Sequence, residues 1–255
     1  MKIRKILCGV LAGVMAAALT GCEKASSGTD ADVKSDKSSI VMATNAEFPP
    51  YEYKDGENIV GIDVEIAQAI ADDLGLELIV EDMAFDSILE AVKSGKADMG
   101  IAGLTVDEER LEKVNFSNPY TTATQVVVIK SGNEIDFPGD LVGKKVGVQL
   151  GTTGAAYAGD IEDAVVEEYN LGVEAVQALA DGKIDAVIID REPAKVFVSQ
   201  IGGLSILDEE FTVEDYAVAV AKGNDELLEK INTSLANLES SGKLKEIIDK
   251  YISAE

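Results

Sequence analysis

The sequence contains no histidine, and only two of its 255 residues are cysteines. The absence of histidine excludes catalytic triads built on that residue and most zinc sites. Cys8 and Cys22 both lie near the start of the chain, so the remainder has neither a thiol nucleophile nor a disulfide. No acidic loop of the DxDxDG type indicates calcium binding. We therefore expect neither a metal nor another cofactor.

Positive charge is also scarce. The chain has 22 lysines and arginines against 47 aspartates and glutamates, and its formal net charge is −25. Binding of nucleic acid needs clustered lysines and arginines, and an anionic membrane surface does not attract so acidic a domain. Both kinds of partner are excluded for the folded part, and the charge mainly favours solubility.

The start of the chain has the pattern of a signal peptide. Lys2, Arg4 and Lys5 precede an apolar run at residues 6–19, which is too short to span a bilayer comfortably. The run ends in LTGC, which resembles a lipobox, so we expect cleavage before Cys22 and acylation of its thiol. An ordinary signal peptide followed by a chance cysteine is the alternative.

Cleavage at this position would remove residues 1–21 and leave the mature protein anchored by lipid to the outer face of the cell membrane. The formal net charge would move from −25 to −28, because three positive residues leave with the signal peptide. Residues 22–39 are rich in Ser, Asp, Lys, Gly and Ala and lack aromatic residues, so we expect a disordered tether. The exported domain would depend on its hydrophobic core, since it would have no disulfide.

Beyond the tether, strand and helix patterns alternate, which is typical of a parallel α/β sheet. The segment NAEFPPYEY has two prolines and three aromatic residues and favours a fixed, non-helical loop. Gly75 ends the first helical pattern, and Asp86 is the expected N-cap of the second. The expected strands cover residues 39–44, 76–82 and 97–103, and the expected helices cover residues 63–75 and 86–95.

Two segments of the chain resemble each other. AVKSGKADMGIAG, at residues 91–103, and ALADGKIDAVIID, at residues 178–190, share Ala, Gly, Lys, Asp and Ile at the same offsets. In a looser pair, IVMATNAEF and KVGVQLGTT, a strand pattern runs into a polar loop. We therefore expect two similar α/β lobes, one on each side of residues 121–137.

The end of the chain adds a strand pattern and two amphipathic helices. From the pattern alone, these elements could extend the second lobe or return to the first. The strand is expected at residues 215–222 and the helices at residues 224–242 and 243–252.

In open α/β sheets, ligands bind just beyond the carboxyl ends of the strands, beside the N-termini of helices. The residues at these positions are therefore the candidates for ligand binding. They are Asn45, Phe48, Phe85, Ala102, Gly103, Thr105, Arg110, Gln149, Thr152, Thr153 and Asp190.

The candidate residues have complementary chemistry. Arg110 can hold a carboxylate with a bidentate fork, and GTTG at residues 151–154 can present backbone N–H groups to an anion. Asp190 can receive an ammonium group, which the Gly103 carbonyl and the Thr105 hydroxyl could share. A ligand that carries a carboxylate and an ammonium on one carbon is an α-amino acid.

Each candidate also has an ordinary structural explanation. Arg110 could pair with a neighbouring acid on a helix surface, where such pairs contribute little. Asp190 could cap the segment that follows it. Phe48 and Phe85 could bracket an apolar or cationic side chain, or they could lie in the core. The functional hypothesis rests on the joint placement of these residues at strand ends.

From residue 39 to the C-terminus, the chain resembles the polar amino-acid substrate-binding proteins of ABC importers, the solute-binding protein family 3. The resemblance lies in the motifs ATNAEFPPYEY, GIDVEIAQAIA, IAGLTVDEERLEKVNFSNPY, VGVQLGTT and GKIDAVIIDREPA. It implies a periplasmic-binding-protein fold of type II, in which two α/β lobes joined by two crossover strands close on the ligand by a hinge. The C-terminal helices would then return to lobe 1. The implied boundaries are residues 40–122 and 216–255 for lobe 1 and residues 123–215 for lobe 2, with crossovers near residues 120–124 and 214–217.

The resemblance also implies a role for individual residues. Arg110 and the backbone of Thr152 and Thr153 would hold the α-carboxylate of the ligand. Asp190, the Thr105 hydroxyl and the Gly103 carbonyl would hold its α-ammonium. Phe48 and Phe85 would flank the side chain of the ligand.

The side-chain specificity stays open at this stage. Asn45 occupies a position that is often Asp in members that bind basic amino acids, and this departure weakens a lysine or arginine assignment. Further side-chain contacts could come from Glu47, Gln149 and Glu192, whose orientation the sequence does not indicate.

We expect a monomeric, extracytoplasmic receptor that binds a polar or cationic amino acid and delivers it to a membrane permease with an ATPase. It would perform no catalysis. One alternative is an enzyme on the same scaffold, similar to the cyclohexadienyl dehydratases, in which Glu192 would transfer protons. The other alternative is an amino-acid sensor or adhesin that uses the same ligand site.

Overall fold

The computed structural model describes residues 38–252 of the chain. The predicted signal peptide, the predicted lipidation site at Cys22 and the tether up to residue 37 lie outside the described residues. Within residues 38–252, no helix combines the length and the apolar character that crossing a membrane requires.

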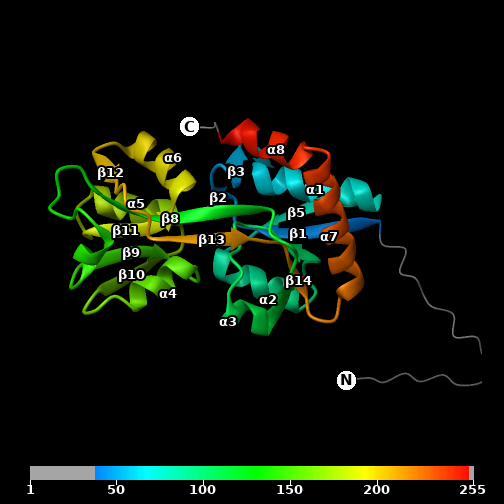
Figure 1. The fold of residues 1–255 in the computed structure, drawn as a ribbon, viewed down its shortest axis with the longest axis horizontal. Helices are drawn as coiled ribbons and strands as arrows, with labels where there is room; N and C mark the ends of the chain where they lie inside the picture. Colours follow the sequence, from blue (N-terminus) through cyan, green and yellow to red (C-terminus); the bar gives the residue numbers. More distant parts are fainter. Residues whose placement is uncertain (1–37, 253–255) are drawn as a thin grey trace, which may run out of the picture. The chain divides into compact units, whose positions relative to one another are not determined.

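Lobe 1 is built around a sheet whose strands come from both ends of the described chain (Figure 1). Its elements are β1 (Ser39–Thr44), β2 (Glu47–Phe48), β3 (Glu52–Asp55), β4 (Asn58–Val60), α1 (Ile62–Leu74), β5 (Glu77–Asp82), η1 (Phe85–Ser87), α2 (Ile88–Lys93), β6 (Met99–Gly100), α3 (Glu108–Lys113), β7 (Val114–Phe116), β14 (Ala219–Ala221), α7 (Asp225–Ser240) and α8 (Lys243–Tyr251). The strand order is β5-β1-β6-β14-β7, and β2, β3 and β4 form a small separate sheet.

Lobe 2 is built around a second sheet formed by one continuous stretch of chain. Its elements are β8 (Thr121–Lys130), η2 (Pro138–Leu141), β9 (Lys145–Gln149), α4 (Thr153–Gly159), β10 (Val165–Tyr169), α5 (Gly172–Ala180), β11 (Ala186–Asp190), α6 (Arg191–Ile201), β12 (Leu204–Ile206) and β13 (Thr212–Tyr216). The strand order is β10-β9-β11-β8-β12, and β13 also pairs with β8.

The two sheets repeat one topology. In each sheet, the strand that begins the repeat (β1 or β9) lies between two parallel neighbours, β5 and β6 in lobe 1 and β10 and β11 in lobe 2. The next strand, β14 or β8, is antiparallel. The two-lobe α/β fold is therefore confirmed, and the two motif pairs of the sequence fall on corresponding strands.

Two strands connect the lobes. β8 and β13 pair in antiparallel register from Thr121 opposite Tyr216 to Gln125 opposite Thr212, and Figure 1 shows both running between the two sheets. At the lobe 1 end, Tyr216 packs in the core of that lobe. Further along β8, the side chains enter the core of lobe 2.

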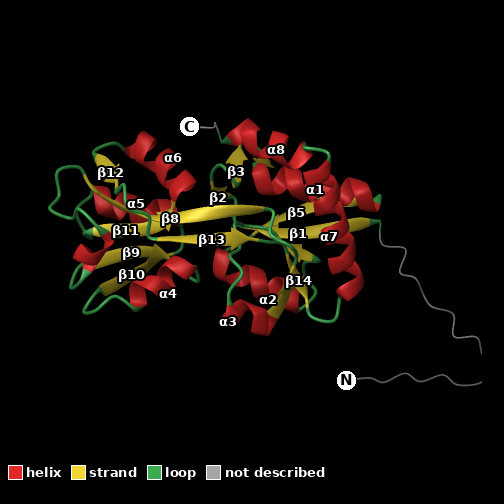
Figure 2. Cartoon of the chain, in the orientation of Figure 1, coloured by secondary structure: helices red, strands yellow, loops and turns green. Residues whose placement is uncertain are grey.

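Helices cover both faces of the lobe 2 sheet (Figure 2). Val126 and Val128 pack with residues of α5 and α6, whereas Val127 and Ile129 pack with α4. Successive residues of a strand point to opposite faces, so a sheet buried on both faces needs a continuous apolar run. The run VVVI in β8 meets this requirement.

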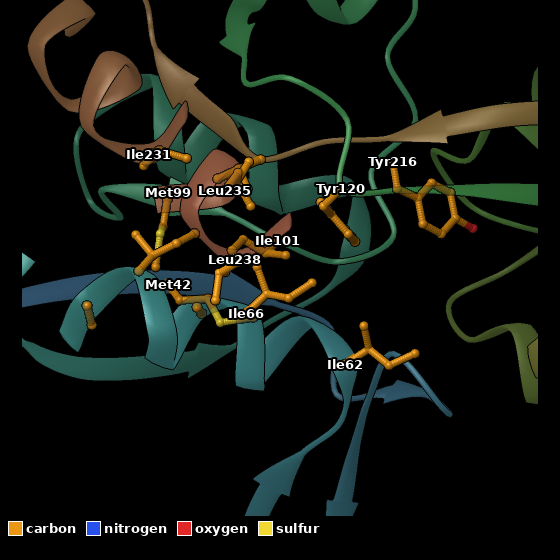
Figure 3. Packing of buried hydrophobic residues seen from close by; sticks show 14 of the residues in the cluster. Met42, Ile62, Ile66, Met99, Ile101, Tyr120, Tyr216, Ile231, Leu235 and Leu238 are labelled. Atoms are coloured by element: carbon orange, nitrogen blue, oxygen red, sulfur yellow. The ribbon is translucent and has the colours of Figure 1, made fainter. Parts of the chain in front are cut away.

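The C-terminal helices pack on lobe 1. In α1, Ile62, Ile66 and Ile70 recur at helical spacing and are fully buried. Ile231 and Leu235 of α7 join them in one cluster with residues of the lobe 1 sheet (Figure 3). The strand order and this cluster show that β14, α7 and α8 pack with lobe 1 and do not extend lobe 2.

Three local predictions need correction. The segment NAEFPPYEY is non-helical as expected, but it is more than a loop, because it contains β2 and the start of β3, which pair at Glu47 and Tyr53. Asp86 is not an N-cap, because a 3-10 turn begins one residue earlier and α2 starts only after Ser87. The expected strand at residues 215–222 is broken, since β13 ends at Tyr216 and β14 starts afresh to pair with β6.

Candidate ligand-binding cleft

A narrow cavity lies between the lobes, at the carboxyl ends of the strands, and the water-accessible space inside it is about 20 Å³. All eleven predicted ligand-binding residues line it, together with two residues that the sequence did not indicate. The lining comprises Asn45, Phe48, Glu52, Phe85, Ala102, Gly103, Thr105, Arg110, Gln125, Gln149, Thr152, Thr153 and Asp190.

Arg110 is held at the start of a short helix. Asp107 is the N-cap of α3, and its side chain accepts a hydrogen bond of 2.7 Å from the Arg110 backbone N–H. The guanidinium donates from Nη1 to the Thr105 carbonyl at 2.8 Å and from Nη2 to the Gly151 carbonyl at 3.1 Å. Its Nε lies 3.2 Å from Asp107 Oδ2. Gly151 belongs to lobe 2, so this arginine also joins the two lobes.

The Arg110 guanidinium keeps donors for a ligand. An arginine has five N–H groups, and its contacts among the described residues use one on each nitrogen. One N–H remains on each of Nη1 and Nη2, which suits a bidentate carboxylate. Arg110 does pair with Asp107, as its ordinary structural explanation proposed. The pair is not a surface contact, however, because only 7% of the Arg110 side chain is exposed. The Phe85 ring covers the guanidinium, with its centroid 5.6 Å from Cζ.

Asp190 contributes a buried acid at the end of β11. Its side-chain Oδ1 has no hydrogen-bond partner among residues 38–252. Burial raises the pKa of this carboxyl to about 7, and the negative charge of Glu214 adds to the increase. The neighbouring Tyr216 hydroxyl and Arg110 oppose the change. A buried carboxylate without a partner is costly, so Asp190 is set up to receive a cation.

The chain between β6 and α3 brings a backbone turn to the cavity. Gly103 has φ +55°, and a Cβ at this position would lie 3.1 Å from the Tyr216 ring, so glycine allows this close approach. Its N–H donates to Asp63 at 2.8 Å. The Thr105 hydroxyl donates to Glu214 Oε2 at 2.9 Å, and its lone pairs stay available as acceptors.

On the lobe 2 side, the cavity meets the start of α4. Thr152 is the N-cap, and its hydroxyl accepts from the Ala155 N–H at 3.2 Å. The first N–H groups of any helix have no partner inside it, so those of Thr153 and Gly154 can face an anion. Gly151, with φ +78°, allows the lobes to approach, since a Cβ there would lie 3.0 Å from Asp86 Cβ.

Asn45 and Gln149 form a direct bridge between the lobes. Gln149 Nε2 donates to Asn45 Oδ1 at 2.9 Å and to the Asn170 carbonyl at 3.1 Å. Asn45 Nδ2 donates to the Met83 carbonyl at 2.9 Å. Both amide groups line the cavity and are engaged with the protein.

Glu52 and Gln125 are the lining residues that sequence reasoning missed. Glu52 lies on β3 and is completely buried. Burial raises the pKa of its carboxyl well above the ordinary value, and the neighbouring Asp63 carboxylate acts in the same direction. The sequence signal for Glu52 was the segment EYKD, which follows the two prolines. If this segment is a very short strand, its alternating residues Glu52 and Lys54 lie on the same face. Gln125 lies on β8 and follows no pattern that separates it from an ordinary strand residue.

Two acids that were considered for ligand contact lie elsewhere. Glu47 pairs with Lys54 at 3.2 Å, and Glu192 pairs with Lys195 at 3.0 Å. Neither residue is among those that line the cavity. The dehydratase alternative depended on Glu192 as the proton-transfer group, so the geometry does not favour it.

The fold and the cleft agree with the comparison to known families. The model of the bacterial extracellular solute-binding proteins, family 3, matches residues 40–254. The chain belongs to this family. The resemblance noted in the sequence is thereby confirmed, and the members of family 3 are binding proteins rather than enzymes.

Relatives in family 3 include receptors for different amino acids. The arginine-binding extracellular protein ArtP of Bacillus subtilis strain 168 is 34% identical over 259 residues, which cover 99% of this chain and 100% of ArtP. The L-cystine-binding protein TcyJ of Escherichia coli strain K12 is 31% identical over 257 residues, which cover 99% of this chain and 96% of TcyJ.

A solved structure of an ancestral arginine-binding protein bound to arginine superimposes with a TM-score of 0.80 at 41% identity. The match covers 85% of this chain and 99% of the ancestral protein. This chain therefore has the two-lobe fold of family 3.

Proposed function

We propose that the protein binds a free L-α-amino acid between its lobes and delivers it to the permease and ATPase of an ABC importer. The observation that carries the proposal is that two buried side chains of opposite charge, Arg110 and Asp190, line the same cavity. Arg110 comes from lobe 1 and keeps two N–H groups, and Asp190 comes from lobe 2 and keeps an unpaired oxygen. An α-amino acid carries the two complementary charges on one carbon.

The carboxylate of the ligand would lie against Arg110 and the backbone N–H of Thr153. The Thr152 N–H, which donates to the Gln149 carbonyl at 3.4 Å, would turn from that carbonyl to the ligand. The ammonium would lie against Asp190 and the acceptor side of Thr105, near the Gly103 carbonyl. Charge-assisted hydrogen bonds of this kind are about twice as strong as neutral ones. A ligand held by both lobes binds the closed form more tightly than the open one, which is the requirement for closure.

The side chain of the ligand would lie between Phe48 and Phe85, and we propose that it is cationic. Asn45 supplies only a neutral amide, but Glu52 places a carboxyl group on the same wall of the cavity. Aromatic faces also attract cations. Receptors for arginine and for L-cystine among the relatives are consistent with a polar or cationic ligand.

We also propose the arrangement of the whole chain. Residues 1–21 would be a signal peptide, and lipid on Cys22 would anchor the protein outside the cell through a tether. Lobe 1 would comprise residues 40–122 and 216–255, and lobe 2 residues 123–215. The membership of β14, α7 and α8 in lobe 1 supports these boundaries. The protein would act as a monomer.

A thermal-shift screen of the twenty amino acids, cystine and ornithine tests the function. A ligand that binds only the folded protein raises the melting temperature by mass action, and the free energy gained is about 2.7 kcal/mol at a hundred times Kd. We expect arginine, lysine or ornithine to give the largest shift. A flat screen, with no amino acid above buffer at millimolar concentration, would contradict the proposal.

A further inference from the structure

Glu214 lies outside the ligand cavity and has no place in the proposed contacts with the amino acid. It sits in the middle of β13, one of the two strands that join the lobes, and only 6% of it is exposed. A buried carboxylate must be satisfied by hydrogen bonds. The surrounding structure must therefore supply hydrogen-bond donors to the Glu214 carboxylate.

Four donors converge on the Glu214 carboxylate. Oε2 accepts from the Thr105 hydroxyl at 2.9 Å, from Gln125 Nε2 at 3.1 Å and from the Thr153 hydroxyl at 3.1 Å. Oε1 accepts from the Tyr157 hydroxyl at 2.8 Å. All four donors are neutral groups, and the charge of the nearby Arg110 guanidinium also acts on Glu214.

The donors come from both lobes. Thr105 belongs to lobe 1, whereas Thr153 and Tyr157 belong to α4 of lobe 2. Two hydroxyls from opposite lobes can both reach a single oxygen only when the lobes are close together. An opened cleft would separate them and would leave part of this buried carboxylate unpaired or exposed to water.

Glu214 also determines where the protons of the two threonine hydroxyls lie. A carboxylate can only accept, and each hydroxyl has one proton, so Thr105 and Thr153 must both direct that proton to Glu214. The Thr153 oxygen in addition accepts from Gln125 Nε2 at 3.0 Å. Thr105 is left as a hydrogen-bond acceptor at the cavity wall, which suits an ammonium and disfavours a second carboxylate.

We propose that Glu214 is the closure residue of this receptor: it ties the two lobes together around the bound amino acid and orients the Thr105 hydroxyl as an acceptor. The inference rests on the proposed function, in that the closed arrangement held by Glu214 is the one that would surround the amino acid. The contacts of Glu214 involve only protein groups and are present without ligand. Glu214 acts through other residues and is a positioning residue.

The test compares Glu214→Ala with Glu214→Gln in the full chain, by stopped-flow measurement of association and dissociation of the amino acid that the screen identifies. Loss of all four acceptor contacts should speed dissociation about tenfold to a hundredfold, because it leaves buried donors without a partner. Association should change little, because most effects of such contacts appear in the dissociation rate. In Glu214→Gln, the amide oxygen can keep the three contacts of Oε2, and the amide nitrogen can donate to Tyr157, so dissociation should stay within about fivefold of wild type.

Two further variants separate closure from folding. Tyr157→Phe removes one lobe 2 donor at a half-buried position that does not line the ligand cavity, and it should speed dissociation several-fold. Asp215→Ala removes the neighbouring acid of the same strand, whose side chain is exposed, and should leave both rates unchanged. If Glu214→Ala and Tyr157→Phe both dissociate within twofold of wild type, or if Asp215→Ala has the same effect as they do, the proposal is overturned.

A distance measurement on the ligand-free protein tests the role of Glu214 independently of the proposed function. Spin labels at Lys113→Cys in lobe 1 and Glu168→Cys in lobe 2, on a Cys8→Ser and Cys22→Ser background, report the width of the groove that both residues line. Glu214→Ala should shift the distance distribution to longer values. A wild-type protein that binds no amino acid contradicts the proposed function, while an unchanged distribution in Glu214→Ala contradicts the role of Glu214.

Discussion

Between β1 and α1, lobe 1 inserts the small sheet of β2, β3 and β4, whereas in lobe 2 the chain passes from β9 to α4 through residues 150–152. The two lobes otherwise share one strand order. The insertion brings Phe48 and Glu52 to the cavity. The short connection in lobe 2 brings the start of α4, with Thr152 and Thr153, to the cavity.

This difference shows how a repeated scaffold acquires two unlike walls. In our proposal, lobe 1 contributes Arg110 for the carboxylate and the residues that surround the side chain of the ligand. Lobe 2 contributes Asp190 for the ammonium. The two side chains that oppose the charges of the same small molecule then come from different lobes, so neither lobe alone makes a complete site.

Loss of the lobe 1 charge should have the largest effect. Truncating one partner of a buried, hydrogen-bonded charge pair costs about 2–5 kcal/mol. Arg110→Ala should therefore weaken binding by roughly two to three orders of magnitude in calorimetry.

Arg191→Ala is the matched control for this variant. Arg191 pairs with Glu210 at 3.0 Å, and it does not line the cavity. Its loss should leave affinity within about twofold of wild type. Affinity of Arg110→Ala within tenfold of wild type would remove this residue from the site.

Acidification should weaken binding through the lobe 2 charge. Asp190 has a pKa of about 7, and an ammonium binds its ionised form, so binding below this pH must displace a proton. Affinity should be level above about pH 7 and fall by up to about tenfold per unit below it. Stability of the ligand-free protein should move the opposite way: because the pKa is raised on folding, the contribution of Asp190 is fully present below the unfolded value, near 3.9, and is lost as the pH rises through about 7.

Calorimetry between about pH 5 and pH 8 measures this profile, and Asp190→Asn provides its reference. The amide does not titrate, so the variant should bind weakly and with a flatter pH dependence. Equal pH dependence in the variant and the wild type would show that another group controls the profile.

The contact between the lobes should have the smallest effect. In Gly151→Ala, the new methyl would lie 3.0 Å from Asp86 Cβ and 3.2 Å from its Cα, and it would also strain a backbone with φ +78°. Overpacking of this kind typically costs about 1–3 kcal/mol, so affinity should fall about fivefold or more.

Gly132→Ala isolates the contribution of the contact. Gly132 has nearly the same φ of +81°, but a methyl group added there would meet no atom of the described residues within 4 Å. It should show the backbone strain as a lower melting temperature while affinity stays unchanged. If both variants lose affinity equally, closure does not depend on the approach of Gly151 to Asp86.

Much of this architecture could be predicted from the sequence because it depends on local patterns. The spacing of Ile62, Ile66 and Ile70 indicates a helix, and Gly75 marks its end. The repeat of Gly-Lys-x-Asp before an apolar strand indicates two lobes. Strand ends collect the ligand residues in any α/β sheet, which is why all eleven candidates line one cavity.

The remainder depends on pairings between distant segments. Gln125 is placed by the pairing of β8 with β11 and β13, and no local pattern indicates those partners. Glu52 depends on a hairpin only a few residues long. Glu214 offered one usable signal, since it alternates with Tyr216 on the buried face of β13 and is an acid where an apolar residue is expected.

The central claim is that the two lobes together hold the carboxylate and the ammonium of one amino acid. The most direct test is a calorimetric titration of the wild-type protein with the amino acid that the screen identifies, with its α-carboxamide and with its Nα-acetyl derivative. Each derivative removes one charge and keeps the side chain. Both derivatives should bind at least a hundredfold more weakly than the parent amino acid. Binding of either derivative within tenfold of the parent would contradict a site in which both charges of the ligand are held.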